Sequence, residues 1–142
     1  MPVITYFDTS AVVPLLVDEA GTATAADLWD HADRLVSVAL VRVEARAALA
    51  RANRLGRISA LQLHTAKAEL EALLDQVDLV VVDEDLIAAA GDVAEVRTLR
   101  AYDALHLAAA RRADDEDLVL VSGDGALLDA AAALGMATAS VG

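Results

Sequence analysis

The chain has 142 residues, a length that suits one domain, spanning residues 1–142, with a sizeable buried core. Hydrophobic residues make up 57% of it, and no apolar run reaches the roughly 18 residues that cross a bilayer, which excludes a disordered chain and a membrane-spanning one. The N-terminus lacks the basic segment of a secretory signal, and cysteine is absent, so we expect a cytoplasmic protein without disulfides or thiolate metal sites.

Charge is spread unevenly along the chain. The net charge of −12 by itself argues against a nucleic-acid partner, because acidic surfaces repel phosphates. Residues 1–40 carry −5 and residues 71–142 carry −11, whereas residues 41–70 carry +4. The basic segment is either a solvated helix face with ordinary charge alternation or a surface that binds RNA.

The first half of the chain alternates short strands with helices. The apolar, β-prone run at 3–7 predicts a buried strand that ends at Asp8, and residues 35–38 predict a second strand. Short helices are expected at 11–17, where Thr9 and Ser10 suit the helix start, and at 22–31. A pair of helices then fills about 40–77: the first runs over 40–55 with Gly56 as its C-cap, and the second begins at Ser59 with a capping box to Gln62.

The second half repeats the alternation. The continuous apolar run at 79–82 predicts another strand, in a sheet that is covered on both faces. Further strands are expected at 118–121 and, at an edge, 137–141, and further helices at 85–96, 103–112 and 126–134. Strands separated by helices predict an α/β domain with a mostly parallel central sheet, and the helical pair at about 40–77 is its one long excursion.

Two aspartates directly follow predicted strands. Asp8 comes after the first strand, and Asp124 follows the strand at 118–121 within a glycine-flanked turn. Ligands of open parallel sheets bind beyond the carboxyl ends of the strands, where both aspartates would lie. Each aspartate could also be a simple helix N-cap, so this position alone leaves both interpretations open.

Glu44 faces an apolar stripe of its predicted helix. Its neighbours three and four residues away are Leu40, Val41, Ala47 and Ala48. An unpaired carboxylate buried there would be costly, so Glu44 must form a salt bridge with an arginine or reach a polar cavity.

Asp103 stands at the head of another apolar helix. It could cap that helix or belong to a site, and His106 one turn later fits a core histidine with one hydrogen bond. His31 and His64 have no partner pattern, and we expect both at the surface.

A cluster of all four acids would need a cation. Two carboxylates about 4 Å apart repel by roughly 4 kcal/mol at an effective dielectric constant near 20. Oxygen ligands without cysteine or an organised histidine set favour Mg²⁺, with Mn²⁺ as the alternative. Such an ion would turn the most negative part of the surface into a place where phosphate binds.

Four motifs occur in a characteristic order. They are Tyr6-Phe-Asp-Thr-Ser-Ala11, Val43-Glu44, Leu99-Arg-Ala-Tyr-Asp-Ala-Leu-His-Leu-Ala108, and Ser122-Gly-Asp124 followed by Leu127-Leu128. In this order and at these spacings the motifs resemble those of PIN domains, and among them the VapC toxins of type II toxin–antitoxin pairs. The resemblance covers nearly the whole chain.

The resemblance implies a three-layer α/β/α fold and a metal-dependent endoribonuclease. It assigns catalysis and metal binding to Asp8, Glu44, Asp103 and Asp124, with support from the hydroxyls of Ser10 and Ser122. The family often has threonine where this chain has Ser122, and either residue supplies a hydroxyl. Water activated by the ion would hydrolyse a phosphodiester bond in RNA. The resemblance implies a structured RNA as substrate, and in such toxins this is often transfer or ribosomal RNA.

The resemblance also implies partners. The expected partner is a cognate VapB-type antitoxin that silences the enzyme by filling its groove. A homodimer is expected, and a heterotetramer or larger assembly with the antitoxin. Arginines are the candidates for binding the RNA backbone: Arg42, Arg46, Arg51, Arg54, Arg57, Arg100, Arg111 and Arg112.

Two alternatives remain at this point. An aspartate-nucleophile phosphatase would also place an aspartate such as Asp8 after a strand. It usually needs a second aspartate where this chain has Ser10, and a catalytic lysine, whereas Lys67, the only lysine, falls in a mid-chain helix. A non-catalytic module on the same scaffold could instead bind RNA or protein through the helical pair, although the intact set of four acids argues against it.

Overall fold

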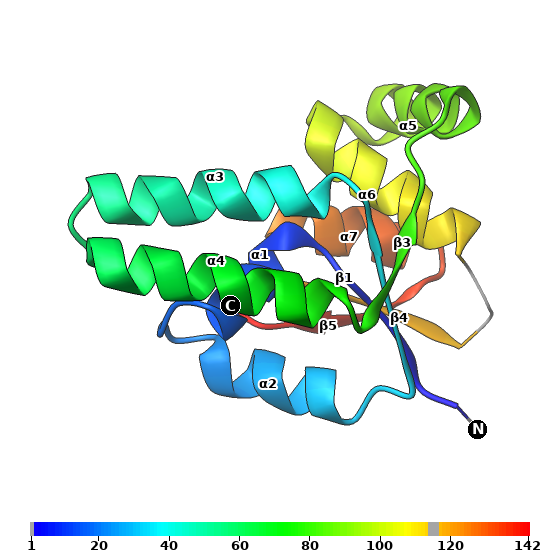
Figure 1. Ribbon diagram of the computed structural model, residues 1–142. Helices are drawn as coiled ribbons and strands as arrows, with labels where there is room; N and C mark the ends of the chain where they lie inside the picture. Colours follow the sequence, from blue (N-terminus) through cyan, green and yellow to red (C-terminus); the bar gives the residue numbers. More distant parts are fainter. Residues whose placement is uncertain (1, 114–116) are drawn as a thin grey trace.

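A parallel β-sheet forms the centre of the molecule (Figure 1). The computed structural model describes residues 2–113 and 117–142. Its strands form one five-stranded sheet with all neighbours parallel, in the order β3-β2-β1-β4-β5. The predicted parallel sheet and its C-terminal edge strand are confirmed. The strands are β1 (Ile4–Phe7), β2 (Arg34–Val38), β3 (Val77–Val80), β4 (Leu118–Ser122) and β5 (Ala137–Ser140).

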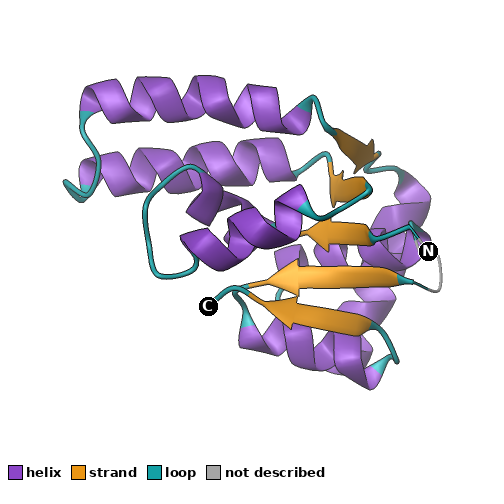
Figure 2. Cartoon of the chain, turned by 90° about the horizontal axis from the view of Figure 1, so that it is seen from below, coloured by secondary structure: helices purple, strands orange, loops and turns teal. Residues whose placement is uncertain are grey.

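Helices cover both faces of the sheet, which gives the expected three-layer α/β/α architecture (Figure 2). One face packs against α5 (Glu84–Arg97), α6 (Ala101–Arg112) and α7 (Gly125–Ala133). The other packs against α1 (Thr9–Val12), α2 (Thr22–Asp30), α3 (Val41–Arg54) and α4 (Ala60–Leu74). A short 3₁₀ helix, η1 (Val13–Leu15), follows α1.

The two faces have separate apolar cores because side chains alternate along each strand. Tyr6 and Leu120 belong to the core under α5, α6 and α7. Their neighbours Phe7 and Val121 belong to the core on the opposite face. Phe7 there meets the ring of Trp29 from α2 edge to face, with centroids 5.1 Å apart. Both faces of β1 are therefore buried, and the strand leads straight into Asp8.

The helical pair α3 and α4 extends beyond the sheet, as Figure 1 shows. Ser59 forms the predicted capping box with Gln62, and Gly56 adopts a left-handed φ of 74° after α3. A small third core, which includes Leu49 and Ile58, holds the distal end of the pair together. In the described part of the chain, each helix is too short or too polar to span a bilayer.

Strand β3 differs from its predicted position. It occupies Val77–Val80 instead of 79–82, and Val81 and Val82 beyond it are exposed. The sheet is covered on both faces, as this run predicts, but β3 itself is an edge strand whose side chains are only partly covered. An apolar run does not define where pairing ends, whereas the partner strand does: Val38 at the end of β2 pairs with Val80.

The helix that carries Asp103 begins earlier than predicted. It starts at Ala101, and its N-cap is Arg100, which makes no side-chain capping bond. Asp103 lies in the first turn, so the interpretation as an N-cap was wrong. The first helix likewise begins at Thr9 instead of 11, because Asp8 caps it by accepting a hydrogen bond from the Ala11 amide.

Replacing Leu107 by alanine tests the core under α6. Leu107 is fully buried between the helix and the sheet. We expect Leu107→Ala to lower the free energy of unfolding by about 2–5 kcal/mol, since it removes buried methyl groups and leaves a cavity. Urea unfolding measures the change. The control Leu61→Ala, at a position 73% exposed, should stay within about 0.5 kcal/mol of the unmodified chain. Equal losses in the two variants would contradict this account of the core.

Candidate active site

A cleft of about 380 Å³ opens beyond the carboxyl ends of β1 and β4. The chain passes from β1 to one side of the sheet and returns to the other side with β4, so the cleft lies at the point where strand order reverses, a preferred binding position in such sheets. All four predicted acids line this cleft, together with Ser10 and His106. The lining residues are Asp8, Thr9, Ser10, Val13, Glu19, Glu44, Ala48, Arg100, Asp103, His106 and Asp124.

Asp8 is the most enclosed of the four acids. The residue is 4% exposed, and its backbone amide continues the β1–β4 ladder by donating to the Val121 carbonyl at 3.2 Å. Its Oδ1 accepts hydrogen bonds from the Ser10 hydroxyl at 2.7 Å and from the Ala11 amide at 3.2 Å. Its Oδ2 accepts one from the Ser122 hydroxyl at 3.1 Å. Asp8 is thus a helix cap and also a member of the cleft.

The two serines also fix the loop after β4. The Ser10 hydroxyl accepts a hydrogen bond from the Gly123 amide at 2.8 Å, and the Ser122 hydroxyl accepts one from the Asp124 amide at 2.9 Å. Each serine therefore links the Asp8 carboxylate to the backbone that carries Asp124. Ser122 is fully buried and ends β4, whereas the sequence predicted it in a turn.

The environment of Asp8 disfavours its charged form. Burial raises the pKa of the Asp8 carboxyl from 3.8 to about 6, against the opposing effects of His106 and of the hydrogen bonds from Ser10 and Ser122. The three groups that donate hydrogen bonds to this carboxylate are all neutral. A cation placed beside Asp8 would therefore stabilise it in the ionised state.

Glu44 projects into the cleft from the first turn of α3. The Oε1 atom of Glu44 accepts hydrogen bonds from the Thr9 hydroxyl at 3.0 Å and from Nε2 of His106 at 2.7 Å. The sequence left an arginine salt bridge and a polar cavity as its alternatives. The cavity is correct, and the partners are a hydroxyl and an imidazole.

His106 joins Glu44 to the core of the protein. A carboxylate only accepts hydrogen bonds, so Nε2 of His106 carries a proton and Nδ1 can accept from the Tyr6 hydroxyl at 2.8 Å. Burial raises the pKa of Tyr6 well above its ordinary value, which keeps that hydroxyl protonated. The prediction of a buried histidine is confirmed, although His106 has three hydrogen-bond partners, Tyr6, Glu44 and Thr9, where one was expected. His31 and His64 are exposed, as predicted.

Asp103 and Asp124 share one arginine. The guanidinium of Arg100 donates to Oδ2 of Asp103 at 3.2 Å through both Nε and Nη2, and to Oδ2 of Asp124 at 3.0 Å through Nη2. The other oxygen of Asp124 caps α7 by accepting from the amides of Ala126 and Leu127. Burial and the charge of Asp124 raise the pKa of Asp103, and Arg100 acts in the opposite direction.

The four carboxylates share the cleft without forming a tight cluster. Within residues 2–113 and 117–142, no three histidine, aspartate or glutamate side chains converge closely enough to bind one ion together. The acids are held apart by local partners: serines for Asp8, His106 for Glu44, and Arg100 for Asp103 and Asp124. The oxygen-only donor set and the buried Asp8, which lacks a cationic hydrogen-bond donor, nevertheless fit a hard divalent ion.

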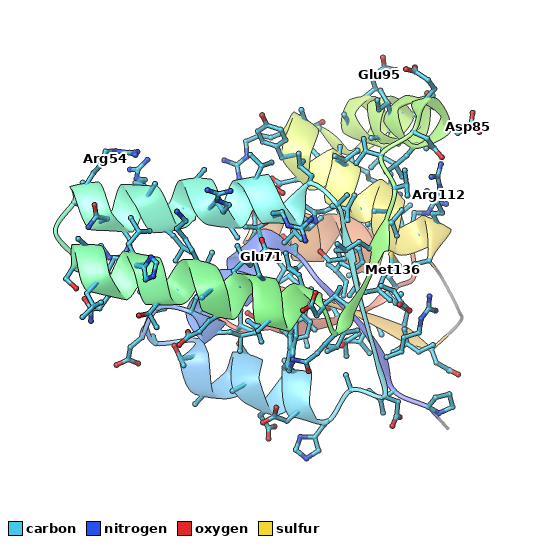
Figure 3. All side chains as sticks on the ribbon, in the orientation of Figure 1. Arg54, Glu71, Asp85, Glu95, Arg112 and Met136 are labelled. Atoms are coloured by element: carbon cyan, nitrogen blue, oxygen red, sulfur yellow. The ribbon has the colours of Figure 1, made fainter. Side chains whose placement is uncertain are left out.

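The predicted RNA-binding arginines lie in several places. Arg57 follows α3 and pairs with Glu19 at 3.2 Å, and Arg111 lies in the last turn of α6. Arg100 lines the cleft. Four arginines lie on α3, and one of them, Arg42, is paired with Glu71 of α4 at 3.0 Å. Arg112 lies at the far end of α6, where it pairs with Asp83, away from the helix start that carries Asp103 (Figure 3). The arginines on α3 are Arg42, Arg46, Arg51 and Arg54.

The sequence interpretation missed three features of the cleft. Glu19 lines the cleft as a fifth acid and pairs with Arg57 at 3.2 Å. Thr9 was assigned only to a helix start, and nothing in its sequence context reveals its contact with Glu44, which lies 35 residues away. Arg100 was considered for RNA binding alone. Its spacing three residues before Asp103 was the available signal, because side chains at that separation meet at a helix start.

Comparison with known proteins identifies the family. The model of the PIN domain matches residues 5–133. Ribonuclease VapC45 of Mycobacterium tuberculosis (strain CDC 1551 / Oshkosh) is 37% identical over 135 residues, which cover 95% of this chain and 93% of the relative.

Solved structures agree in fold. PAE2754 from Pyrobaculum aerophilum matches with a TM-score of 0.71 and 26% identity, over 98% of this chain and 84% of that one. VapBC-5 of Mycobacterium tuberculosis, a member of the VapBC family of toxin–antitoxin systems, matches with a TM-score of 0.54 and 21% identity over 98% of both chains, and this likeness concerns the fold alone. From its motifs, its sheet and its similarity to a ribonuclease over most of both chains, the protein belongs to the PIN-domain family and, within it, to the VapC-type ribonucleases.

Proposed function

We propose that this protein is a Mg²⁺-dependent endoribonuclease toxin that hydrolyses phosphodiester bonds in structured transfer or ribosomal RNA. The observation that carries the proposal is the gathering of Asp8, Glu44, Asp103 and Asp124 around one cleft at the switch point of the sheet. The oxygen-only donors favour Mg²⁺, and Mn²⁺ would fit the same set.

Each acid has a separate role in this proposal. Asp8, Asp103 and Asp124 would hold the ion directly or through water, and Glu44 would complete the set from α3. The bound ion would supply an activated water and would offset the charge that develops on the phosphate. Ser10 and Ser122 orient the Asp8 carboxylate, and Tyr6 and Thr9 fix His106 and Glu44.

RNA would reach the cleft along the basic helix α3. Arg46, Arg51 and Arg54 are exposed on α3, and Arg100 lies in the cleft itself. Positive side chains on this path would offset the net charge of −12 that the chain presents to RNA. Selection of particular RNAs would then depend on shape and loop contacts.

A cognate VapB-type antitoxin is the proposed inhibitor. This proposal is supported by the shared fold with VapBC-5, which is itself a member of a family of toxin–antitoxin systems. Occupation of the acidic cleft by the antitoxin would exclude RNA and so silence the enzyme in the cytoplasm. A homodimer, and a heterotetramer or larger complex with the antitoxin, complete the proposed assembly.

The two alternative functions have little support. A phosphatase would need a lysine in the cleft, and Lys67 instead lies on α4, beside a different pocket that Arg46 and His64 line. A purely binding module would have no use for four acids around one cleft.

Asp103→Asn tests the nuclease assignment. Asparagine preserves size and removes the charge that would hold the ion, so we expect Mg²⁺-dependent RNA cleavage to fall about 100-fold or more. Cleavage of total RNA by the purified protein, followed by mapping of the new ends, measures the effect.

The matched control for this test is Asp129→Asn. Asp129 is exposed on α7 and lies outside the cleft lining, so its substitution should leave cleavage within about twofold. If Asp103→Asn cleaved RNA as fast as the control, with both variants folded, the proposed mechanism would be wrong.

The raised pKa of Asp8 links stability to pH. An acid with a higher pKa in the folded state binds more protons when folded, so stability falls as pH rises through the interval between the two pKa values. For Asp8 that interval runs from 3.8 to about 6, and the full cost, roughly 3 kcal/mol, is present above it. A divalent ion beside Asp8 would recover part of this cost.

Asp8→Asn should therefore stabilise the metal-free protein at neutral pH. We expect its free energy of unfolding to exceed that of the unmodified chain by about 1–3 kcal/mol at pH 7.5, and the difference to vanish below pH 4. Urea unfolding across this pH range, with chelator present, measures it. Added Mg²⁺ should stabilise the unmodified chain more than the variant. The stability difference between the variant and the unmodified chain should be larger at pH 7.5 than at pH 4. A difference that is smaller at pH 7.5 would contradict the role of burial at Asp8.

A further inference from the structure

Arg100 occupies the space between two of the acids that the proposed function assigns to the metal. It stands at the N-cap of α6, where it forms no capping bond with its side chain. Its Nη2 atom is 3.2 Å from Oδ2 of Asp103 and 3.0 Å from Oδ2 of Asp124. One guanidinium thus links two carboxylates that come from different helices.

This contact differs from the other arginine pairs of the molecule. Arg34, Arg42, Arg57 and Arg112 pair with acids outside the set of four. Among the lysines and arginines of the described ranges, 2–113 and 117–142, the recorded ion pairs with the four acids all come from Arg100. The guanidinium therefore supplies positive charge where Asp103 and Asp124 would otherwise repel each other.

The position of Arg100 favours exchange. Its side chain is 82% exposed, whereas the side chains of Asp103 and Asp124 are 12% and 22% exposed. Ion pairs of such an exposed side chain are weak, because solvent screens the charges and the side chain loses conformational entropy when the pair forms. A divalent ion offers two charges in a compact shell and competes well for the same oxygens.

We propose that Arg100 is an internal counter-cation that a divalent ion displaces from Asp103 and Asp124, and that the released guanidinium then binds the RNA phosphate. This inference rests on the proposed function, since it concerns the same metal and the same substrate. A guanidinium forms two parallel hydrogen bonds with a phosphate, so release from the acids leaves it suited to a new anionic partner. Arg100 is in this way a positioning residue of the metal-free state and a substrate-binding residue of the loaded one.

The first test measures metal binding without catalysis. Calorimetric titration of chelator-treated protein with Mn²⁺ at pH 7.5 compares the unmodified chain with Arg100→Ala. Removal of the competing cation should tighten Mn²⁺ binding roughly fivefold. Arg100→Lys keeps the positive charge but lacks the guanidinium group that contacts both carboxylates. Its Mn²⁺ affinity should lie between those of the unmodified chain and Arg100→Ala.

Arg54→Ala is the matched control. It removes the same charge from the end of α3 near the distal end of the helical pair (Figure 3). Its Mn²⁺ affinity should stay within about twofold of the unmodified chain, because solvent and salt screen a charge at that distance.

The second test separates metal from substrate in cleavage assays. Arg100→Ala should reach half-maximal rate at a lower Mg²⁺ concentration and show a KM for RNA raised roughly tenfold, as expected for one lost charge-assisted phosphate contact. Tighter Mg²⁺ dependence together with a higher KM for RNA distinguishes this role from a structural one. A purely structural defect would weaken the binding of both Mg²⁺ and RNA.

The outcomes are distinguishable. If Asp103→Asn abolishes Mn²⁺ binding while Arg100→Ala leaves it unchanged or weaker, the displacement is wrong and the proposed function stands. If Arg100→Ala tightens Mn²⁺ binding without raising KM, the transfer to phosphate is wrong. If the unmodified chain binds no Mn²⁺, both the proposed function and this inference fail.

Discussion

The hydrogen bonds that hold the Asp8 carboxylate between two serine hydroxyls organise the cleft. Ser10 follows β1 and Ser122 ends β4, and each also binds the backbone that carries Asp124. These bonds require β1 and β4 to lie side by side in register, as the pairing of Phe7 with Val121 ensures. The apolar cores on both faces of β1 hold that register, so packing far from the cleft decides where its oxygen atoms lie.

The same arrangement creates an electrostatic problem that the protein solves locally. Four acids around one cleft are stable only if each finds compensation. Asp8 accepts hydrogen bonds from neutral donors, which offset only part of the rise in its pKa that burial causes. Glu44 relies on Thr9 and His106, and Asp103 and Asp124 rely on Arg100. Compensation of this kind offsets the repulsion among the acids, and it leaves the oxygens of Asp8 without a positively charged hydrogen-bond donor.

Much of this architecture could be predicted from local sequence patterns. The features that depend on contacts between distant segments could not. Strand–helix alternation predicted the sheet. Capping chemistry predicted the cap at Ser59 and gave capping as one of two interpretations for Asp8 and Asp124, because caps depend on residues close in sequence. The end of β3 was misplaced since an apolar run continues past its last pair with β2. The partners of Glu44 come from segments 35 and 62 residues away, which no local pattern encodes. The metal and RNA roles of these residues stay predictions.

The order of the strands in the sheet has a consequence for synthesis. The three strands on one side, β3, β2 and β1, are complete once residue 80 is made, whereas β4 pairs with β1 only after Leu118 to Ser122 have emerged. Asp124 arrives with the last helix, and Ser122 with the end of β4. A growing chain can thus fold its first half as a unit while its cleft still lacks one wall. The four acids therefore come together only after residue 124 has been made, well after the first three strands are complete.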